Sequence, residues 1–133
     1  MKLNHDCVRD LLLYIEDNLQ HGSSLCAQNV ILKPYENHDI IYTAVKLSEA
    51  NFIEATKMNY ISDLIPVIHI HSLTWDGHKF LDNIRDDRVW ADTKEVTADF
   101  SSVSLRVIEN VAVQIITALI NRQICNNTDL NLK

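Results

Sequence analysis

Apolar residues recur at intervals of three and four positions near the beginning of the chain, which is the spacing of one face of a helix. These residues are Cys7, Val8, Leu11, Leu12, Ile15 and Leu19. Asn4 stands where its side chain can cap such a helix, and His21-Gly22-Ser23-Ser24 supplies the glycine and turn residues that end it. The pattern therefore predicts a first helix between Asn4 and His21.

The next apolar positions predict an extended segment and then a second helix. Leu25 to Leu32 is short and rich in Leu, Val and Ile, so we expect a strand or an irregular extended segment. A helix then begins at Asn37 and ends near Ala50 or Asn51, since Asn tolerates the left-handed conformation that often ends a helix. Its inner side consists of Ile40, Ile41, Ala44, Val45 and Leu47.

A hairpin, called the wing below, is predicted to follow this helix. Its strands are expected at Phe52–Ala55 and Pro66–His71, with a long tip over residues 56–65. The alternative DNA-binding interpretation uses the helix over residues 37–51 and the whole wing over residues 52–72.

The segment from Leu73 to Asp82 predicts a direct joint between the wing and a third helix. Thr74 can cap this helix, and Asp76 places a carboxylate in its first turn, where the helix dipole favours it. Gly77 allows close packing, and Phe80 or Leu81 can dock on the core. A helix reached through a hairpin, after a helix upstream, is typical of a winged-helix-like domain.

Two more helices are predicted in the last third of the chain. A break near Asp86-Asp87 precedes a short helix from Arg88 to about Thr97, with Trp90 as its anchor. Ser101 or Ser102 then caps a final helix of roughly 24 residues, about 36 Å long.

The final helix carries two apolar seams, and a domain of this size covers only one of them. The first seam consists of Leu105, Ile108, Ala112, Ile115 and Leu119, and the second of Val113, Ile116, Ile120 and Ile124. We expect a partner chain to cover the second seam.

Length and composition favour one α+β domain, since the chain has 133 residues and 47% of them are hydrophobic. We expect a winged-helix-like core over residues 1–87, consisting of helices plus a β-hairpin wing. A helical extension with a long C-terminal helix follows over residues 88–125, and a disordered tail over residues 126–133.

Charge and cysteine usage restrict the partners and the compartment. The net charge is −6, which disfavours nucleic acid because phosphate neutralisation supplies most non-specific affinity. Cys7, Cys26 and Cys125 form no Cys-x-x-Cys pair, and scattered cysteines fit a reducing cytoplasm. The longest apolar stretch, Val111 to Ile120, is about half the length of a membrane span. We expect a cytoplasmic protein that does not bind membranes.

Three segments resemble a family of small, often prophage-associated bacterial proteins, the domain of unknown function twenty-five-thirteen. They are Met1-Lys2-Leu3 with Val8 to Glu16, Ile41 to Ile53, and Leu73 to Trp90. The family pattern has a His and a Gly where this chain has Thr43 and Asn51, so a role that rests on that His does not carry over. The resemblance extends over nearly the whole chain and implies a winged-helix-like fold without an established activity.

Three histidines are candidate metal ligands. His69 and His71 fall on one face of the second wing strand, because side chains alternate along a strand, and His78 lies one helical turn into the next helix. Two imidazoles with a carboxylate such as Asp76 are a possible ligand set. We favour the alternative that the strand presents a polar outer face, and we expect no metal and no cofactor.

The acidic run from Asp82 to Asp99 is a candidate for acid and base chemistry, since paired carboxylates can take these two roles. Arg85, Arg88 and Lys94 interleave with the acids, which instead favours a solvated ion-pair surface. We expect no catalytic residues and no enzymatic activity.

The most economical interpretation is a binding module that works through protein–protein contacts or homodimerisation. The expected oligomer interface is the second seam, Val113, Ile116, Ile120 and Ile124. The alternative is a DNA-binding transcriptional regulator with candidate contacts at Tyr42, Thr43, Lys46, Lys57 and Asn59. These elements offer few basic side chains and no Arg to read guanine, so nucleic acid is the less favoured partner.

Overall fold

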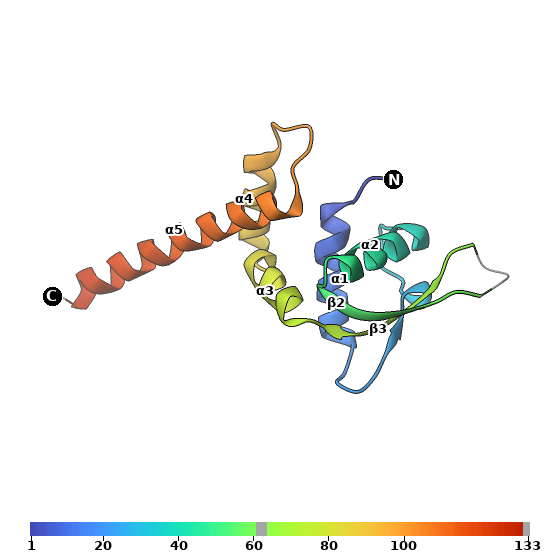
Figure 1. Cartoon of the computed structure of the whole chain (residues 1–133). Helices are drawn as coiled ribbons and strands as arrows, with labels where there is room; N and C mark the ends of the chain where they lie inside the picture. The colour runs from blue at the N-terminus through green and yellow to red at the C-terminus, as the bar shows by residue number, and fades with distance from the viewer. Residues whose placement is uncertain (61–63, 132–133) are drawn as a thin grey trace. The chain divides into compact units, whose positions relative to one another are not determined.

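The computed structural model describes the backbone of residues 1–60 and 64–131 and the side chains of these residues up to Asn127 (Figure 1). The chain divides into two compact units, Met1–Leu81 and Asp82–Lys133. The division falls inside a helix, α3, whereas the sequence suggests one domain with a boundary after residue 87. The predicted α+β class and the long C-terminal helix are confirmed.

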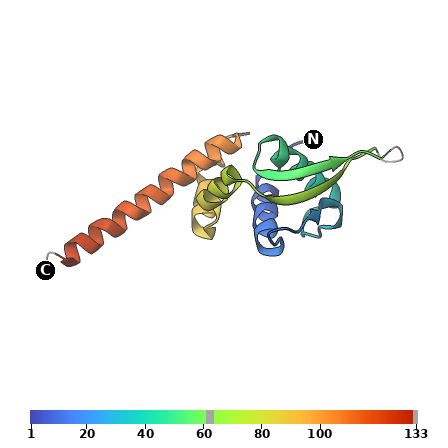
Figure 2. The same cartoon turned by 60° about the horizontal axis from the view of Figure 1, so that its bottom comes forward.

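The first unit combines helices with a small antiparallel sheet of strand order β1-β3-β2. Its elements are α1 (His5–Asn18), β1 (Leu25–Cys26), η1 (Ala27–Asn29), α2 (Asn37–Glu49), β2 (Ile53–Met58), β3 (Val67–Leu73) and the start of α3 (Trp75–Ile84). Helices α1 and α2 pack on each other and on the sheet. The β2–β3 hairpin runs on beyond them (Figure 2).

The N-terminal helix follows its sequence pattern closely. The side chain of Asn4 accepts hydrogen bonds from the backbone N–H groups of Asp6 and Cys7, at 2.9 and 3.1 Å. Cys7 and the next four apolar positions of the predicted face are buried, and Leu19 is half-buried. The predicted cap and the predicted helix face are therefore confirmed.

A bulge in the hairpin sets which side chains of β3 face the core. Ala55 pairs with Ile70 and Glu54 with Ser72, so His71 has no partner residue opposite it. The extra residue shifts the alternation of inward and outward side chains by one position, so Ile70 and Leu73 are both buried although they are three positions apart. Strand β2 continues to Met58, so the first part of the predicted tip is strand, while residues 61–63 lie outside the described residues.

A side-chain amide extends the sheet edge beyond β1. The sequence predicts an extended segment over Leu25–Leu32, but β1 has only two residues and a 3₁₀ turn follows it. Gln28 lies in this turn and donates to the carbonyl of Pro66 at 2.9 Å. Its Oε1 accepts the N–H of Ile68 at 3.1 Å, so one side chain gives β3 the donor and acceptor that another strand residue would give.

The end of α2 is a Schellman motif. Asn51 has a φ of 63°, the left-handed conformation predicted for it. The N–H of Phe52 donates to the carbonyl of Leu47 at 2.9 Å, and that of Asn51 to Ser48 at 3.1 Å, which satisfies two carbonyls at the helix end.

The joint between β3 and α3 is fastened to the end of α2. The N–H of Thr74 donates to the carbonyl of Phe52 at 3.0 Å. The Thr74 hydroxyl donates to the carbonyl of Asn51 and accepts the N–H of Gly77 at 3.0 Å, so its predicted capping role is confirmed. A Cβ added to Gly77 would lie 1.9 Å from the Phe52 carbonyl oxygen, so only glycine fits here.

The second unit contains the end of α3, α4 (Asp87–Thr97) and α5 (Leu105–Asn131). Asp86 caps α4 by accepting the N–H of Val89 at 3.0 Å. Ser104, rather than Ser101 or Ser102, caps α5 by accepting the N–H of Val107 at 3.2 Å. The prediction that Ser101 or Ser102 caps this helix was wrong. All of these serines carry the same capping hydroxyl, so the sequence alone does not indicate which of them stands at the helix start.

Helix α5 is longer than its sequence pattern suggests. It has 27 residues and reaches Asn131, where the sequence interpretation places a disordered tail from residue 126. Residues 105–131 contain no glycine or proline that would stop a helix. None of the helices within the described residues is long and apolar enough to cross a membrane.

Replacing Gly77 by Ala is expected to destabilise the fold by about 3 kcal/mol, because the new methyl group must displace the backbone of Phe52. Urea unfolding followed by circular dichroism measures this loss. Asp76→Ala, an exposed change in the same helical turn, is the control and should cost less than about 1 kcal/mol. Equal midpoints for Gly77→Ala and wild type would show that α3 does not approach Phe52 this closely.

Replacing Gln28 by Ala is expected to cost about 1–3 kcal/mol, because the carbonyl of Pro66 and the N–H of Ile68 lose their partner. Amide hydrogen exchange by NMR gives the sharpest measurement, since the Ile68 amide should exchange markedly faster in the variant. The exposed Gln20→Ala is the matched control. An unchanged Ile68 exchange rate would contradict the side-chain clamp.

Candidate functional site

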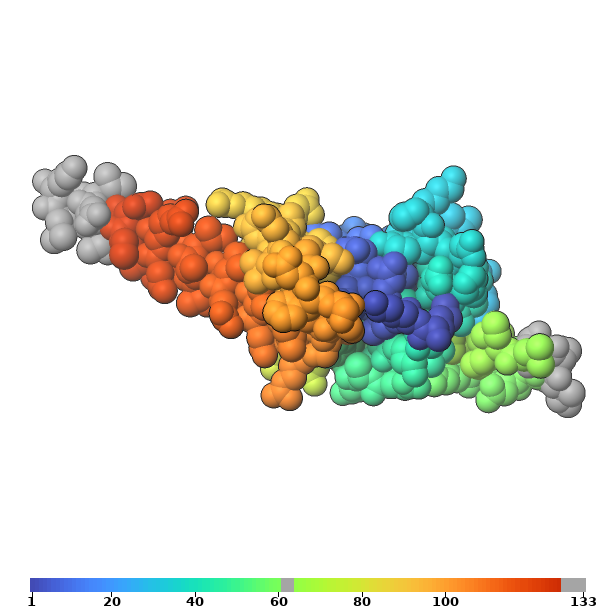
Figure 3. Space-filling model, turned by 90° about the horizontal axis from the view of Figure 1, so that it is seen from above, coloured from blue at the N-terminus to red at the C-terminus, as the bar shows by residue number. Residues whose placement is uncertain are grey.

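The second half of α5 exposes the seam that the sequence predicts as an interface. Near the start of the helix, Ile108 and Ala112 are buried at 1% and 0% exposure. Further along, Val113, Ile120 and Ile124 are 39%, 52% and 55% exposed, and Ile116 is intermediate. In the space-filling view, α4 does not cover the red second half of α5 (Figure 3). Ile108 and Ala112 of the first seam are therefore buried within the unit, whereas Val113, Ile120 and Ile124 of the second seam are exposed.

This exposed face is almost free of charge. From Asn110 to Asn127 the sequence contains one ionisable residue of the Asp, Glu, Lys and Arg types, Arg122. Successive helix residues are rotated by about 100° at 3.6 residues per turn, so Arg122 lies about 160° from Ile120. The face formed by Val113, Ile116, Ile120 and Ile124 is called the α5 stripe below.

The surface of α2 offers little to a nucleic acid. Thr43 is 2% exposed and its hydroxyl donates to the buried Sγ of Cys7 at 3.3 Å, so the prediction that it is exposed was wrong. The hydroxyl of Tyr42 donates to the carbonyl of Met1 at 3.2 Å. Thr43 falls on the inward side because α2 packs on α1 as well as on the sheet.

The one lysine of α2 is neutralised locally. The Nζ of Lys46 donates to Oε2 of Glu49 at 2.9 Å and lies 5.5 Å from the centre of the Tyr42 ring. This hydrogen bond raises the pKa of Lys46 and lowers the pKa of Glu49. The carboxylate of Glu49 offsets the positive charge that Lys46 would offer to a phosphate.

The wing carries both polar and apolar exposed side chains. Lys57 and Asn59 are exposed as the DNA-binding interpretation requires. The apolar Met58 and Tyr60 beside them are 42% and 48% exposed, and Leu64 across the hairpin is fully exposed. This apolar character was missed, since the alternation that predicts a strand stops before the tip.

The candidate metal ligands do not converge. Nε2 of His71 lies 2.7 Å from the hydroxyl of Thr56, and His69 pairs along the sheet with Thr56 and Cys26. His78 is exposed on α3. Among the described residues, the group whose His and carboxylate atoms lie within 4.8 Å of one another is Glu36, His38 and Asp39.

The group at Glu36, His38 and Asp39 is better described as an exposed ion-pair cluster. Nδ1 of His38 lies 3.2 Å from Glu36 and its Nε2 lies 3.4 Å from Asp39. A ring nitrogen that carries an N–H can donate to the carboxylate beside it, and exposed acidic groups of this kind are common without a metal ion. A metal ion would need one of these nitrogens as a free acceptor.

A cleft of about 390 Å³ opens between the end of α1, the end of β3 and the first turn of α3. Ile15, Leu19 and Leu73 contribute apolar surface, and the three histidines His21, His71 and His78 contribute polar surface. Sequence analysis missed the cleft because His21 lies 50 positions before His71 in the chain. The nearby Trp75 was missed as well, and it is 80% exposed.

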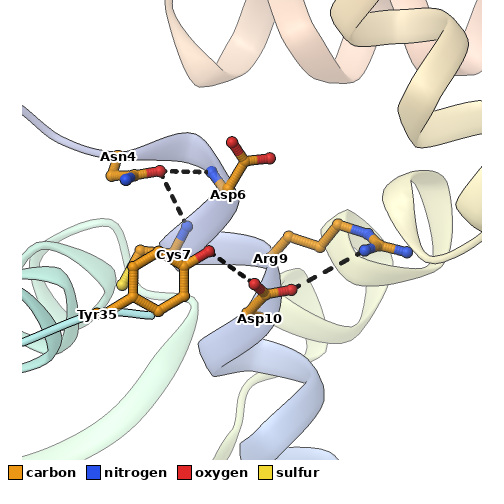
Figure 4. Close-up of polar contacts among 6 residues, drawn as sticks. All are labelled: Asn4, Asp6, Cys7, Arg9, Asp10 and Tyr35. Atoms are coloured by element: carbon orange, nitrogen blue, oxygen red, sulfur yellow. Dashed lines mark hydrogen bonds and ion pairs between the residues drawn. The ribbon is translucent and has the colours of Figure 1, made fainter. Parts of the chain in front are cut away.

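A polar cluster joins the start of α1 to the segment before α2 (Figure 4). The Tyr35 hydroxyl donates to Oδ2 of Asp10 at 2.7 Å, and Oδ1 of Asp10 lies 4.0 Å from the Arg9 guanidinium. Burial, with the Asp10 hydrogen bond, raises the pKa of Tyr35. Burial also raises the pKa of Cys7, which keeps this thiol protonated and unreactive, as expected of a core residue.

The acidic run from Asp82 to Asp99 contributes a surface ion pair and the cap of α4. The guanidinium of Arg85 donates to Asp82 at 3.0 Å, and Asp86 is occupied by the N-terminus of α4. These contacts agree with the ion-pair interpretation of this segment.

Comparison with known proteins places the chain in a family without an assigned activity. The family model described as "Hypothetical protein (DUF2513)" matches residues 2–104. An uncharacterized protein of Haemophilus influenzae is 31% identical over 121 residues, which cover 90% of this chain and 99% of that protein. No solved structure matches. The matched range includes the joint at Thr74, nearly all of the first unit and the part of the second unit before α5, so the chain belongs to the DUF2513 family.

Proposed function

We propose that this chain is a non-enzymatic, winged-helix-like binding module that associates with a second copy of itself through the α5 stripe. The scattered cysteines favour the reducing cytoplasm as its compartment. The exposed α5 stripe is the observation that carries the proposal, and the element order of the first unit supports the domain type.

The first unit has the element order of a winged helix. A helix, a short strand, a helical turn, a second helix and a hairpin follow one another, and β3 lies between β1 and β2. In this topology α2 corresponds to the helix that precedes the wing. The second helical element of such a domain is reduced here to the three residues of η1.

Cover from a partner would stabilise the second half of α5 as a helix. Isolated helices shorter than about 12–15 residues are marginal in water. Ile120, Thr117 and Asn121 are among several weak helix formers in this part of α5, and its charged residues, Arg122 and Asp129, are seven positions apart and do not have the spacing of a helical ion pair. Cover from a protein surface therefore supplies stability that the local sequence lacks.

A second copy satisfies the chemistry of the α5 stripe. Covering this uncharged face by the same face of another chain removes apolar surface from water and buries no carboxylate. A basic or acidic partner would find no opposite charge there, except Arg122 on the far side of the helix. The same patch on both chains also meets the requirement for a two-fold contact.

Sedimentation over a range of concentrations tests this association. Wild type should show a reversible monomer–dimer equilibrium, and Ile120→Asp should raise the dissociation constant at least about tenfold, because 1.4 kcal/mol corresponds to a factor of ten. Ala118→Asp adds the same charge on the opposite side of the helix and is the matched control. A wild-type chain that stays monomeric at millimolar concentration would disprove the proposal.

DNA binding through α2 and the wing is the second candidate, and the winged-helix element order favours it. The contacts against it are the Lys46–Glu49 ion pair and the burial of Thr43. We expect no shift of random duplex DNA in a gel assay at low salt, where phosphate contacts are strongest. A shift that Lys57→Glu abolishes and Lys33→Glu preserves would instead establish the DNA-binding function.

A further inference from the structure

The α5 stripe has a spacing that reads the same in both directions. From Val113 through Ile116, Ile120 and Ile124 to Asn127, the steps are three, four, four and three residues. At about 100° per residue, all five positions fall within about 80° of the helix circumference. Ile120 is the centre of this arrangement, and each end continues it by one exposed residue.

Such a spacing is self-complementary when two helices run in opposite directions. With a two-fold axis at Ile120, each Ile120 faces its counterpart, and Ile116 faces Ile124 of the other copy. Val113 then lies opposite Asn127 of the other copy, so an Asn127 side-chain amide stands at each end of the apolar contact.

The alternative is a pair in which the two α5 helices run parallel, and charges at the start of α5 disfavour it. Arg106 and Glu109 lie within about 40° of the direction of Ile120 on the same helix. A parallel pair would bring Arg106 level with Arg106 and Glu109 level with Glu109, and like charges at the same level repel. In the antiparallel pair these residues lie beyond the apolar contact.

The position of α4 and the helix dipoles also favour the antiparallel pair. Helix α4 packs on the first half of α5, where Ile108 and Ala112 are buried. A parallel pair would place both copies of α4 beside the same end of the contact, whereas an antiparallel pair places them at opposite ends. Antiparallel helices also put each positive N-terminus nearer to the negative C-terminus of the other.

We propose that the α5 stripes of two copies of this chain pair antiparallel, with the two-fold axis at Ile120. This inference rests on the proposed self-association and adds its geometry. It specifies which residues of the two copies meet.

Cysteine cross-linking of the full chain separates the two directions. In a Cys125→Ser background, Ile116→Cys chains carrying a mass tag are mixed with untagged Ile124→Cys chains and oxidised mildly. The antiparallel pair predicts mixed disulfides between the two variants in at least about tenfold excess over disulfides of either variant with itself, because a disulfide needs Cα atoms within about 7 Å.

Two further variants make each outcome decisive. Ile120→Cys lies on the axis and should cross-link to itself, while Ala118→Cys faces away and should not. Self-linked Ile116→Cys and Ile124→Cys without the mixed species would overturn the antiparallel geometry and leave the dimer intact. No cross-link at Ile120→Cys, together with monomeric sedimentation of wild type, would overturn the self-association itself.

Discussion

The arrangement of the first unit depends on the position of one residue, Phe52. Its N–H closes the end of α2, its carbonyl accepts the N–H of Thr74, and its ring stacks on Phe80 at 4.8 Å between centroids. The same carbonyl oxygen occupies the space that a side chain at Gly77 would need. This one residue thereby fixes the exit of α2, the start of β2 and the start of α3 together. A change at any of these contacts is transmitted to the other elements, because none of them can shift without breaking a backbone hydrogen bond.

Features encoded by local chemistry could be predicted from the sequence. The Asn4 cap, the left-handed Asn51 and the Thr74 cap each depend on a few neighbouring residues, and all three occur as predicted. Features that depend on distant partners could not be predicted. Gln28 replaces a strand residue only because residues 66 and 68 lie beside it, and the bulge at His71 appears only when β2 and β3 are paired.

The same distinction applies to the candidate surfaces. The exposed face of α5 follows from periodicity, since an apolar helix with two seams can use only one against α4. Thr43 and the histidines show where periodicity is insufficient. Thr43 lies between the two faces of α2, and its burial is decided by contact with Cys7. His21, far away in sequence, joins His71 and His78 around one cleft, and no local pattern contains that information.

The family model and the similar Haemophilus influenzae protein match different lengths of this chain. The family model covers residues 2–104 and ends immediately before α5 begins at Leu105. The uncharacterized protein of Haemophilus influenzae matches over 121 residues, 90% of this chain, so its similarity continues into α5 and part of the α5 stripe. Under the proposed pairing, α5 of the second unit determines how many copies come together, while the cleft and the wing belong to the first unit. The α5 stripe itself carries no charged side chain, so the chain's acidic charge, which lies mostly outside α5, does not oppose contact at the stripe.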